Sequence, residues 1–211
     1  MYKIISGKYE TGSSEEQGGY QMLFGQENIQ YKFDLYFHFY NVVHEFGHCI
    51  VDMQGIKMDK VEEEMYVNSL AVAYWRFVGC EDKIDELRTI LVETIEKVPS
   101  PIPNGLSFKE FFQKIWGTEQ LNNVMLYGFF QLKSVLIAMD TEKEFLDVLG
   151  EIGLKPADNV KESVIAYDEK INADNAHKVI ENVKSNFTTM ELPVPDVTLE
   201  LVDNPMVQCA Q

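Results

Sequence analysis

Cysteine is scarce in this sequence. The 211 residues include three cysteines, Cys49, Cys80 and Cys209, and no two of them stand at CxxC spacing. An odd count without such a pair argues against a disulfide framework and against a zinc site built from thiolates. The pattern fits a protein of a reducing compartment.

Long apolar runs are also missing, because no stretch reaches the roughly 20 residues that a transmembrane helix needs. The short apolar start at Met1–Ile5 is followed by Ser6 and Gly7 rather than by a continuing hydrophobic segment. We therefore expect no secretory signal, no association with a membrane and a cytoplasmic location.

Positively charged residues are also few. Lys and Arg number 18 against 34 Asp and Glu, which gives a formal net charge of −16. Such an acidic surface repels the phosphates of nucleic acids and of anionic membranes. We expect no nucleic-acid partner and a neutral or basic substrate.

The length suits one domain, and a hydrophobic content of 45% is enough for a real core. We predict a single domain over residues 1–211, with a strand-rich part at 1–32, a helical core at 33–187 and an extended tail at 188–211. The tail is interpreted either as ordered against a partner or as packed on the core.

The expected fold class is α+β, predominantly α-helical, with a small N-terminal β-sheet. Alternating and β-branched residues predict strands at 2–6, 21–24 and 29–33. Helical periodicity and the Gly and Pro breaks predict helices at 34–54, 62–78, 81–97, 107–116, 119–139, 142–152 and 160–186.

One helix carries a motif with chemical meaning, His44-Glu45-Phe46-Gly47-His48. Residues four apart on a helix point within roughly 40° of each other, so both imidazoles leave one face and can chelate one ion. Neutral imidazole is a good ligand for zinc, and Glu45 is placed to accept a proton from a water that the metal activates. The motif predicts a catalytic zinc site.

The surroundings of the motif weigh against a solvated helix face. Residues 33–53 are apolar on most sides, which predicts a central helix, while Asn41, the motif and Asp52 share one polar stripe. Burying that stripe without a partner would cost several kcal/mol per charge, and a bound cation is the simplest partner. Gly47 indicates a close approach of another element. A satisfied polar network in the core is the alternative.

A catalytic zinc site usually has three protein ligands and one open position. Residues 62–75 predict a second helix with acidic side chains in its first turn, which suits the helix dipole. Glu64 lies three residues before Val67 on the inward face, whereas Glu62 and Glu63 turn progressively toward water. We predict Glu64 as the third ligand. The alternative is that all three glutamates form a solvated helix start.

These residues resemble the zincin metallopeptidases, and within them the gluzincin type, whose third ligand is a glutamate on the following helix. The nearest likeness is to the small ImmA/IrrE-like peptidases, and it covers about residues 33–77. Fifteen residues separate His48 from Glu64, a shorter connection than many members have. It is still enough for a turn between antiparallel helices.

The resemblance implies a zincin-like metallopeptidase domain that binds one Zn²⁺. By this likeness His44, His48 and Glu64 are the metal ligands and Glu45 is the general base. Asn68 would hold a ligand imidazole by its other nitrogen, and it lies four residues after Glu64 on the same helical face.

Three further side chains have weaker signals. Tyr127 stands beside Gly128 in an apolar helix and could polarise a carbonyl, but an aromatic residue there is more often part of the core. His38 lies off the ligand stripe, and His177 sits in a polar amphipathic helix near the C-terminus. We predict a packing or surface role for both histidines.

Two classes of function fit this sequence. The first is a zinc-dependent metallopeptidase, and the second is a catalytically inactive zincin-like protein that acts as a binding or regulatory module. The presence of Glu45 favours the enzyme. A structural zinc site would close its fourth position with another ligand and would not need a carboxylate to activate water. The expected partner is a peptide or protein substrate, and by analogy with the fold the N-terminal strands are candidates for pairing with it. The substrate and the oligomeric state stay open.

Overall fold

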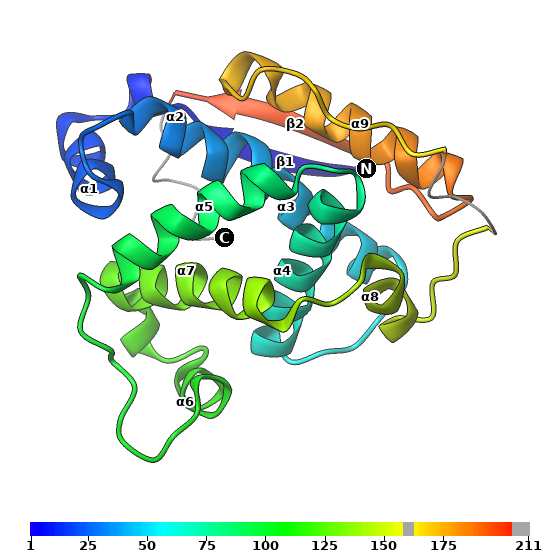
Figure 1. Cartoon of the computed structure of the whole chain (residues 1–211). Coiled ribbons are helices and arrows are strands. Elements are labelled where there is room, and N and C mark those ends of the chain that lie inside the picture. Colours follow the sequence, from blue (N-terminus) through cyan, green and yellow to red (C-terminus); the bar gives the residue numbers. More distant parts are fainter. Residues whose placement is uncertain (158–162, 204–211) are drawn as a thin grey trace.

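A computed structural model describes residues 1–157 and 163–203 of the chain (Figure 1). The fold is predominantly helical with one small sheet, which confirms the predicted fold class. The helices and strands are β1 (Tyr2–Gly7), α1 (Ser14–Phe24), α2 (Ile29–Asp34), the π-helical turn η2 (Leu35–Tyr40), α3 (Asn41–Met53), α4 (Lys60–Phe77), α5 (Glu81–Ile95), α6 (Phe108–Ile115), α7 (Val124–Thr141), α8 (Phe145–Glu151), α9 (Ala176–Thr189) and β2 (Val197–Val202).

The sheet joins the two ends of the chain. β1 pairs in parallel with β2 in a register that runs from Tyr2 opposite Val197 to Gly7 opposite Val202. Its inward face packs on α3 and α9 (Figure 1). Residues 197–202 of the predicted tail therefore form β2 and pair with β1, while residues 204–211 lie outside the described residues.

The predicted strands at 21–24 and 29–33 are wrong, because both segments are helical, in α1 and α2. Ser13 starts α1 with a capping box: its hydroxyl accepts the Glu16 N–H, and the Glu16 carboxylate accepts the Ser13 N–H. Such a cap satisfies two backbone donors that a helix start leaves unpaired. A short apolar run cannot by itself distinguish a strand from a buried helix turn.

Elements α2, η2 and α3 form one continuous helical segment from Ile29 to Met53, so the helix predicted at 34–54 begins earlier. Within it, His38 is buried and its ring nitrogens lie 2.6 Å from Asp34 Oδ1 and 2.8 Å from the Gly7 carbonyl oxygen. These contacts fix the end of β1 to the helix and agree with the predicted packing role of His38. Turns of the η2 type often occur next to functional sites.

The largest helical error concerns the segment predicted at 160–186. Residues 158–162 lie outside the described residues, residues 163–172 are not helical, and α9 begins only at Ala176. The fully buried Asn186 explains the difference, because its amide accepts the Ile165 N–H at 2.7 Å and donates to the Ile165 carbonyl at 2.9 Å. A side chain thus satisfies backbone groups that a helix would otherwise pair.

The remaining predicted helices correspond to α4 through α8. Asn123 separates a short 3-10 turn from α7, since its side chain accepts the N–H groups of Met125 and Leu126. Cys49 and Cys80 are buried free thiols, and Cys209 lies outside the described residues. Among the described helices, none is long and apolar enough to cross a membrane.

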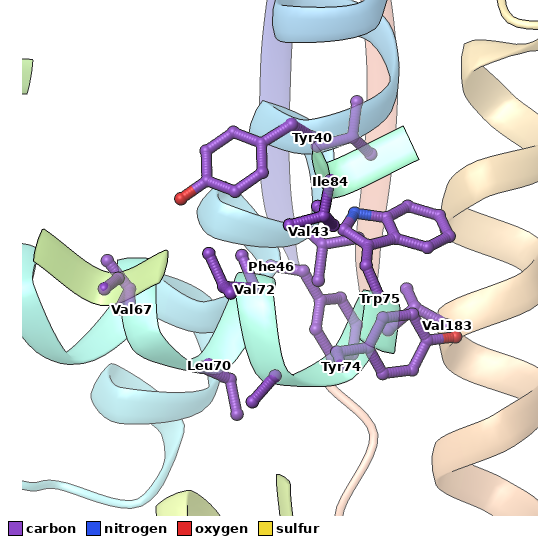
Figure 2. Packing of buried hydrophobic residues seen from close by; sticks show 14 of the residues in the cluster. Tyr40, Val43, Phe46, Val67, Leu70, Val72, Tyr74, Trp75, Ile84 and Val183 are labelled. Atoms are coloured by element: carbon purple, nitrogen blue, oxygen red, sulfur yellow. The ribbon is translucent and has the colours of Figure 1, made fainter. Parts of the chain in front are cut away.

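The core gathers around the contact between α3 and α4. Figure 2 shows Val43 and Phe46 of α3 among the buried side chains of α4. Gly47 lies at the contact itself, because a Cβ atom added there would be 3.1 Å from Val67 Cβ and 3.2 Å from Leu70 Cδ2. The close approach indicated by the sequence is therefore present, and it brings one face of α3 against the first turns of α4.

Candidate metal centre

The structure brings the three predicted ligands together. His44 and His48 of α3 and Glu64 of α4 each offer one ligand atom, and these atoms lie within 4.8 Å of one another. His44 Nε2 is 3.5 Å from Glu64 Oε2, and His48 Nε2 is 3.7 Å from Glu64 Oε1. The centroids of the two imidazole rings lie 4.9 Å apart, and the ring planes are inclined at 80°. The arrangement is a His-His-Glu group that could hold a metal ion.

Two distances in this group are close to those between ligands that share one tetrahedral ion. Ligand atoms about 2.0–2.2 Å from a tetrahedral zinc ion lie roughly 3.4 Å from each other. The observed 3.5 and 3.7 Å are close to that value, whereas a good N–H···O hydrogen bond measures about 2.9 Å. The carboxylate thus lies at the distance of a shared ion rather than of a direct hydrogen bond, which favours the metal site over a satisfied core network.

Asn68 fixes the first imidazole. Its wholly buried side-chain oxygen accepts His44 Nδ1 at 2.9 Å and the Tyr40 hydroxyl at 2.7 Å, and its nitrogen donates to Ser134 Oγ at 3.0 Å. Because the amide oxygen only accepts, the proton of His44 resides on Nδ1 and the lone pair of Nε2 faces Glu64. The hydrogen bond that the resemblance implied for Asn68 is present. Burial lowers the pKa of His44, which favours the neutral ring that a metal needs.

Glu63 holds the second imidazole, which corrects the expectation that it turns toward water. His48 Nδ1 lies 2.8 Å from Glu63 Oε1, and the Glu63 side chain is only 15% exposed. The hydrogen bond from His48 and the nearby Lys60 hold the pKa of Glu63 at about 2 despite its partial burial. Burial alone would lower the pKa of His48, but the hydrogen bond to Glu63 and the neighbouring carboxylates raise it.

Glu45 lies on the same helix and completes the polar stripe. The side-chain amide of Asn41, four residues before Glu45 on α3, donates to Glu45 Oε1 at 3.2 Å. Glu45 is partly buried, and its charge acts on both His44 and His48. The His48 side chain is 25% exposed against 4% for His44, so solvent reaches the group from the His48 side.

Tyr127 and the two remaining histidines have different positions relative to this group. The Tyr127 hydroxyl accepts Gln131 Nε2 at 2.9 Å, and the same nitrogen lies 3.5 Å from Glu64 Oε2. Tyr127 is therefore one side chain away from Glu64, and its proposed action on a carbonyl stays a prediction. His177 is exposed on α9, and His38 belongs to the buried contact with Asp34.

The sequence interpretation missed the role of Glu63 and the contributions of α7. The one sequence signal that bears on Glu63 was Asp59, whose side chain accepts the Glu62 N–H and so sets where α4 begins. Because α4 packs closely on α3 at Gly47, two adjacent residues of α4, Glu63 and Glu64, can both face α3. No local pattern indicates Gln131 or Ser134, because their contacts join residues more than sixty positions apart.

Comparison with protein-family models, with curated proteins and with solved structures finds no match to this chain. The likeness to zincins therefore depends on the motif and on the geometry of the His-His-Glu group.

Proposed function

We propose that this protein is a zinc-dependent metallopeptidase. The observation that supports the proposal most is the convergence of His44, His48 and Glu64 at zinc-like spacing beside the carboxylate of Glu45. Two imidazoles and one carboxylate form a ligand set typical of catalytic zinc, which leaves one position for a reactant.

Zinc held by these ligands would supply Lewis-acid chemistry, polarising a peptide carbonyl and making a water acidic enough to lose a proton near neutral pH. The protein's own groups would then move that proton. Glu45 accepts it from the attacking water and returns it to the leaving amine, as a general base and then a general acid. Asn41 keeps the Glu45 carboxylate on the ligand side of α3.

The substrate side of the proposal concerns strand β1. In the described part of the chain, β1 pairs with β2 on one edge only. The Tyr2 N–H bonds to Asp196, so the backbone groups of Lys3 and Ile5 point to the other edge. We propose that an extended peptide pairs with that edge. The Tyr2 hydroxyl donates at 2.8 Å to Asp52, one helical turn beyond His48, so this hydrogen bond joins β1 to the helix that carries the motif.

The test is cleavage of a diverse peptide library, read by mass spectrometry, with zinc-loaded wild type and Glu45→Gln. We expect cleavage by the wild type, and equal zinc content but no turnover in Glu45→Gln, because glutamine cannot take up the proton. Equal cleavage by both proteins would remove Glu45 from the mechanism. A zinc-loaded wild type that cleaves nothing across the library would overturn the peptidase in favour of a binding or regulatory module.

A further inference from the structure

The two imidazoles of the metal centre are held by acceptors of different chemistry. His44 bonds to a neutral, fully buried amide, whereas His48 bonds to the carboxylate of Glu63, the residue just before the ligand Glu64. Hydrogen bonds to an ionised acceptor are stronger than those to a neutral one. The charged acceptor thus serves the more exposed imidazole, which packing restrains less.

A carboxylate also determines which ring nitrogen carries the proton. An ionised Glu63 has only acceptor sites, so a neutral His48 ring must present Nδ1–H to it and keep the lone pair of Nε2 for the side on which Glu64 lies. The second oxygen of Glu63 accepts Lys60 Nζ at 2.9 Å. Glu63 is therefore fixed at both oxygens, and the contacts run from the exposed Lys60 to a ligand of the metal.

We propose that Glu63 is a positioning residue of the metal centre, which orients the His48 ring and fixes its tautomer so that Nε2 is available to the metal. The inference depends on the proposed metal centre, though not on peptide cleavage. A group that supports a ligand imidazole in this way typically changes metal affinity about 10–100-fold when it is removed.

Glu62 provides the matched control. It is the preceding glutamate on the same helical turn, and it also forms an ion pair, with Lys109, but its carboxylate contacts α6 instead of His48. Glu62→Ala and Glu63→Ala each remove one carboxylate and one surface ion pair from the start of α4. A general effect of lost charge or a loosened helix would appear in both variants, and an effect on His48 would appear only in Glu63→Ala.

The experiment measures zinc affinity by competition with a chromophoric chelator for wild type, Glu62→Ala, Glu63→Ala and Glu63→Gln. We expect Glu63→Ala to bind zinc about 10–100-fold more weakly than wild type. Glu62→Ala should stay within about threefold of wild type, since exposed ion pairs contribute little. Glu63→Gln should fall between them, because it keeps an acceptor oxygen and loses the charge. In NMR spectra of the zinc-loaded proteins, the Nδ1–H proton of His48 should be protected from exchange in wild type and lost in Glu63→Ala.

Zinc affinity of Glu63→Ala within about threefold of wild type would overturn the positioning role while leaving the metal centre intact. An equal loss in Glu62→Ala would also overturn it. A wild type that binds no zinc would instead contradict the metal centre, and the positioning role with it. If Glu63→Ala does not fold, Glu63→Gln tests the positioning role. That role is rejected if Glu63→Gln binds zinc as tightly as wild type and the His48 ring proton of wild type is not protected from exchange.

Discussion

Replacing Gly47 with alanine tests how closely α3, the helix that carries His44 and His48, lies on α4. The added Cβ would be 3.1 Å from Val67 Cβ and 3.2 Å from Leu70 Cδ2, whereas carbon atoms in favourable contact are about 3.5–4.0 Å apart. Val67 is fully buried and β-branched, so it has little freedom to turn aside. The two helices must therefore separate by a few tenths of an ångström.

The expected change in stability follows from two opposing terms. Overpacking a core costs about 1–3 kcal/mol, and alanine in place of a helical glycine returns about 1 kcal/mol. Gly47→Ala should thus lose between about 0 and 2 kcal/mol, which lowers Tm by at most about 8 °C for a chain of this size. Gly128, in α7, is the control, since apart from its chain neighbours and the backbone of its own helix no atom of the described residues lies within 4 Å of its added Cβ. Gly128→Ala should gain about 0.5–1 kcal/mol.

Urea unfolding of the two variants and of wild type in the presence of a chelator measures these free energies. Zinc titration of the folded proteins then shows whether the separation of the helices reaches the metal ligands. We expect weaker zinc binding for Gly47→Ala, because metal–ligand distances tolerate only about ±0.2 Å, and unchanged binding for Gly128→Ala. If Gly47→Ala is stabilised as much as Gly128→Ala, the tight contact between α3 and α4 is refuted.

Three other substitutions separate the contributions of single groups. Asn68→Ala removes the acceptor of two buried donors, so it should lower the free energy of unfolding by about 2–6 kcal/mol and weaken zinc binding about 10–100-fold at a temperature where the protein is folded. Asn186→Ala, which removes an equally buried amide whose hydrogen bonds go to Ile165, Tyr74 and Asn182 rather than to a histidine, should reduce stability and leave zinc affinity unchanged; a matching loss of zinc affinity in both variants would contradict the specific role of Asn68. Tyr127→Phe should lower kcat about 10²–10³-fold if its hydroxyl stabilises the reacting carbonyl oxygen, and kcat equal to wild type would assign Tyr127 to packing.

Local chemistry was sufficient to predict that His44, His48 and Glu64 converge. His44 and His48 are one helical turn apart, so their convergence needs only a helix, and Gly47 between them already indicated the close neighbour. Glu64 required one more assumption, the inward face of the next helix. Each of these steps involves residues within about one helical hairpin, where periodicity carries the information.

Other features could not be predicted because distant parts of the chain determine them. The sheet pairs Tyr2 with Val197, and no pattern near either residue reveals the other. Asn186 holds Ile165 in an extended segment that helical periodicity had included in a helix. Glu63 was expected to face water because a helical wheel describes one helix, whereas its contact with His48 depends on how closely two helices pack.

The most direct measurement is a crystal structure of the wild-type protein grown with zinc and without chelator, with data collected across the zinc absorption edge. We expect one anomalous peak about 2.0–2.2 Å from His44 Nε2, His48 Nε2 and a carboxylate oxygen of Glu64. No peak between these three side chains at saturating zinc, with the imidazoles turned away from Glu64, would contradict the proposed metal centre.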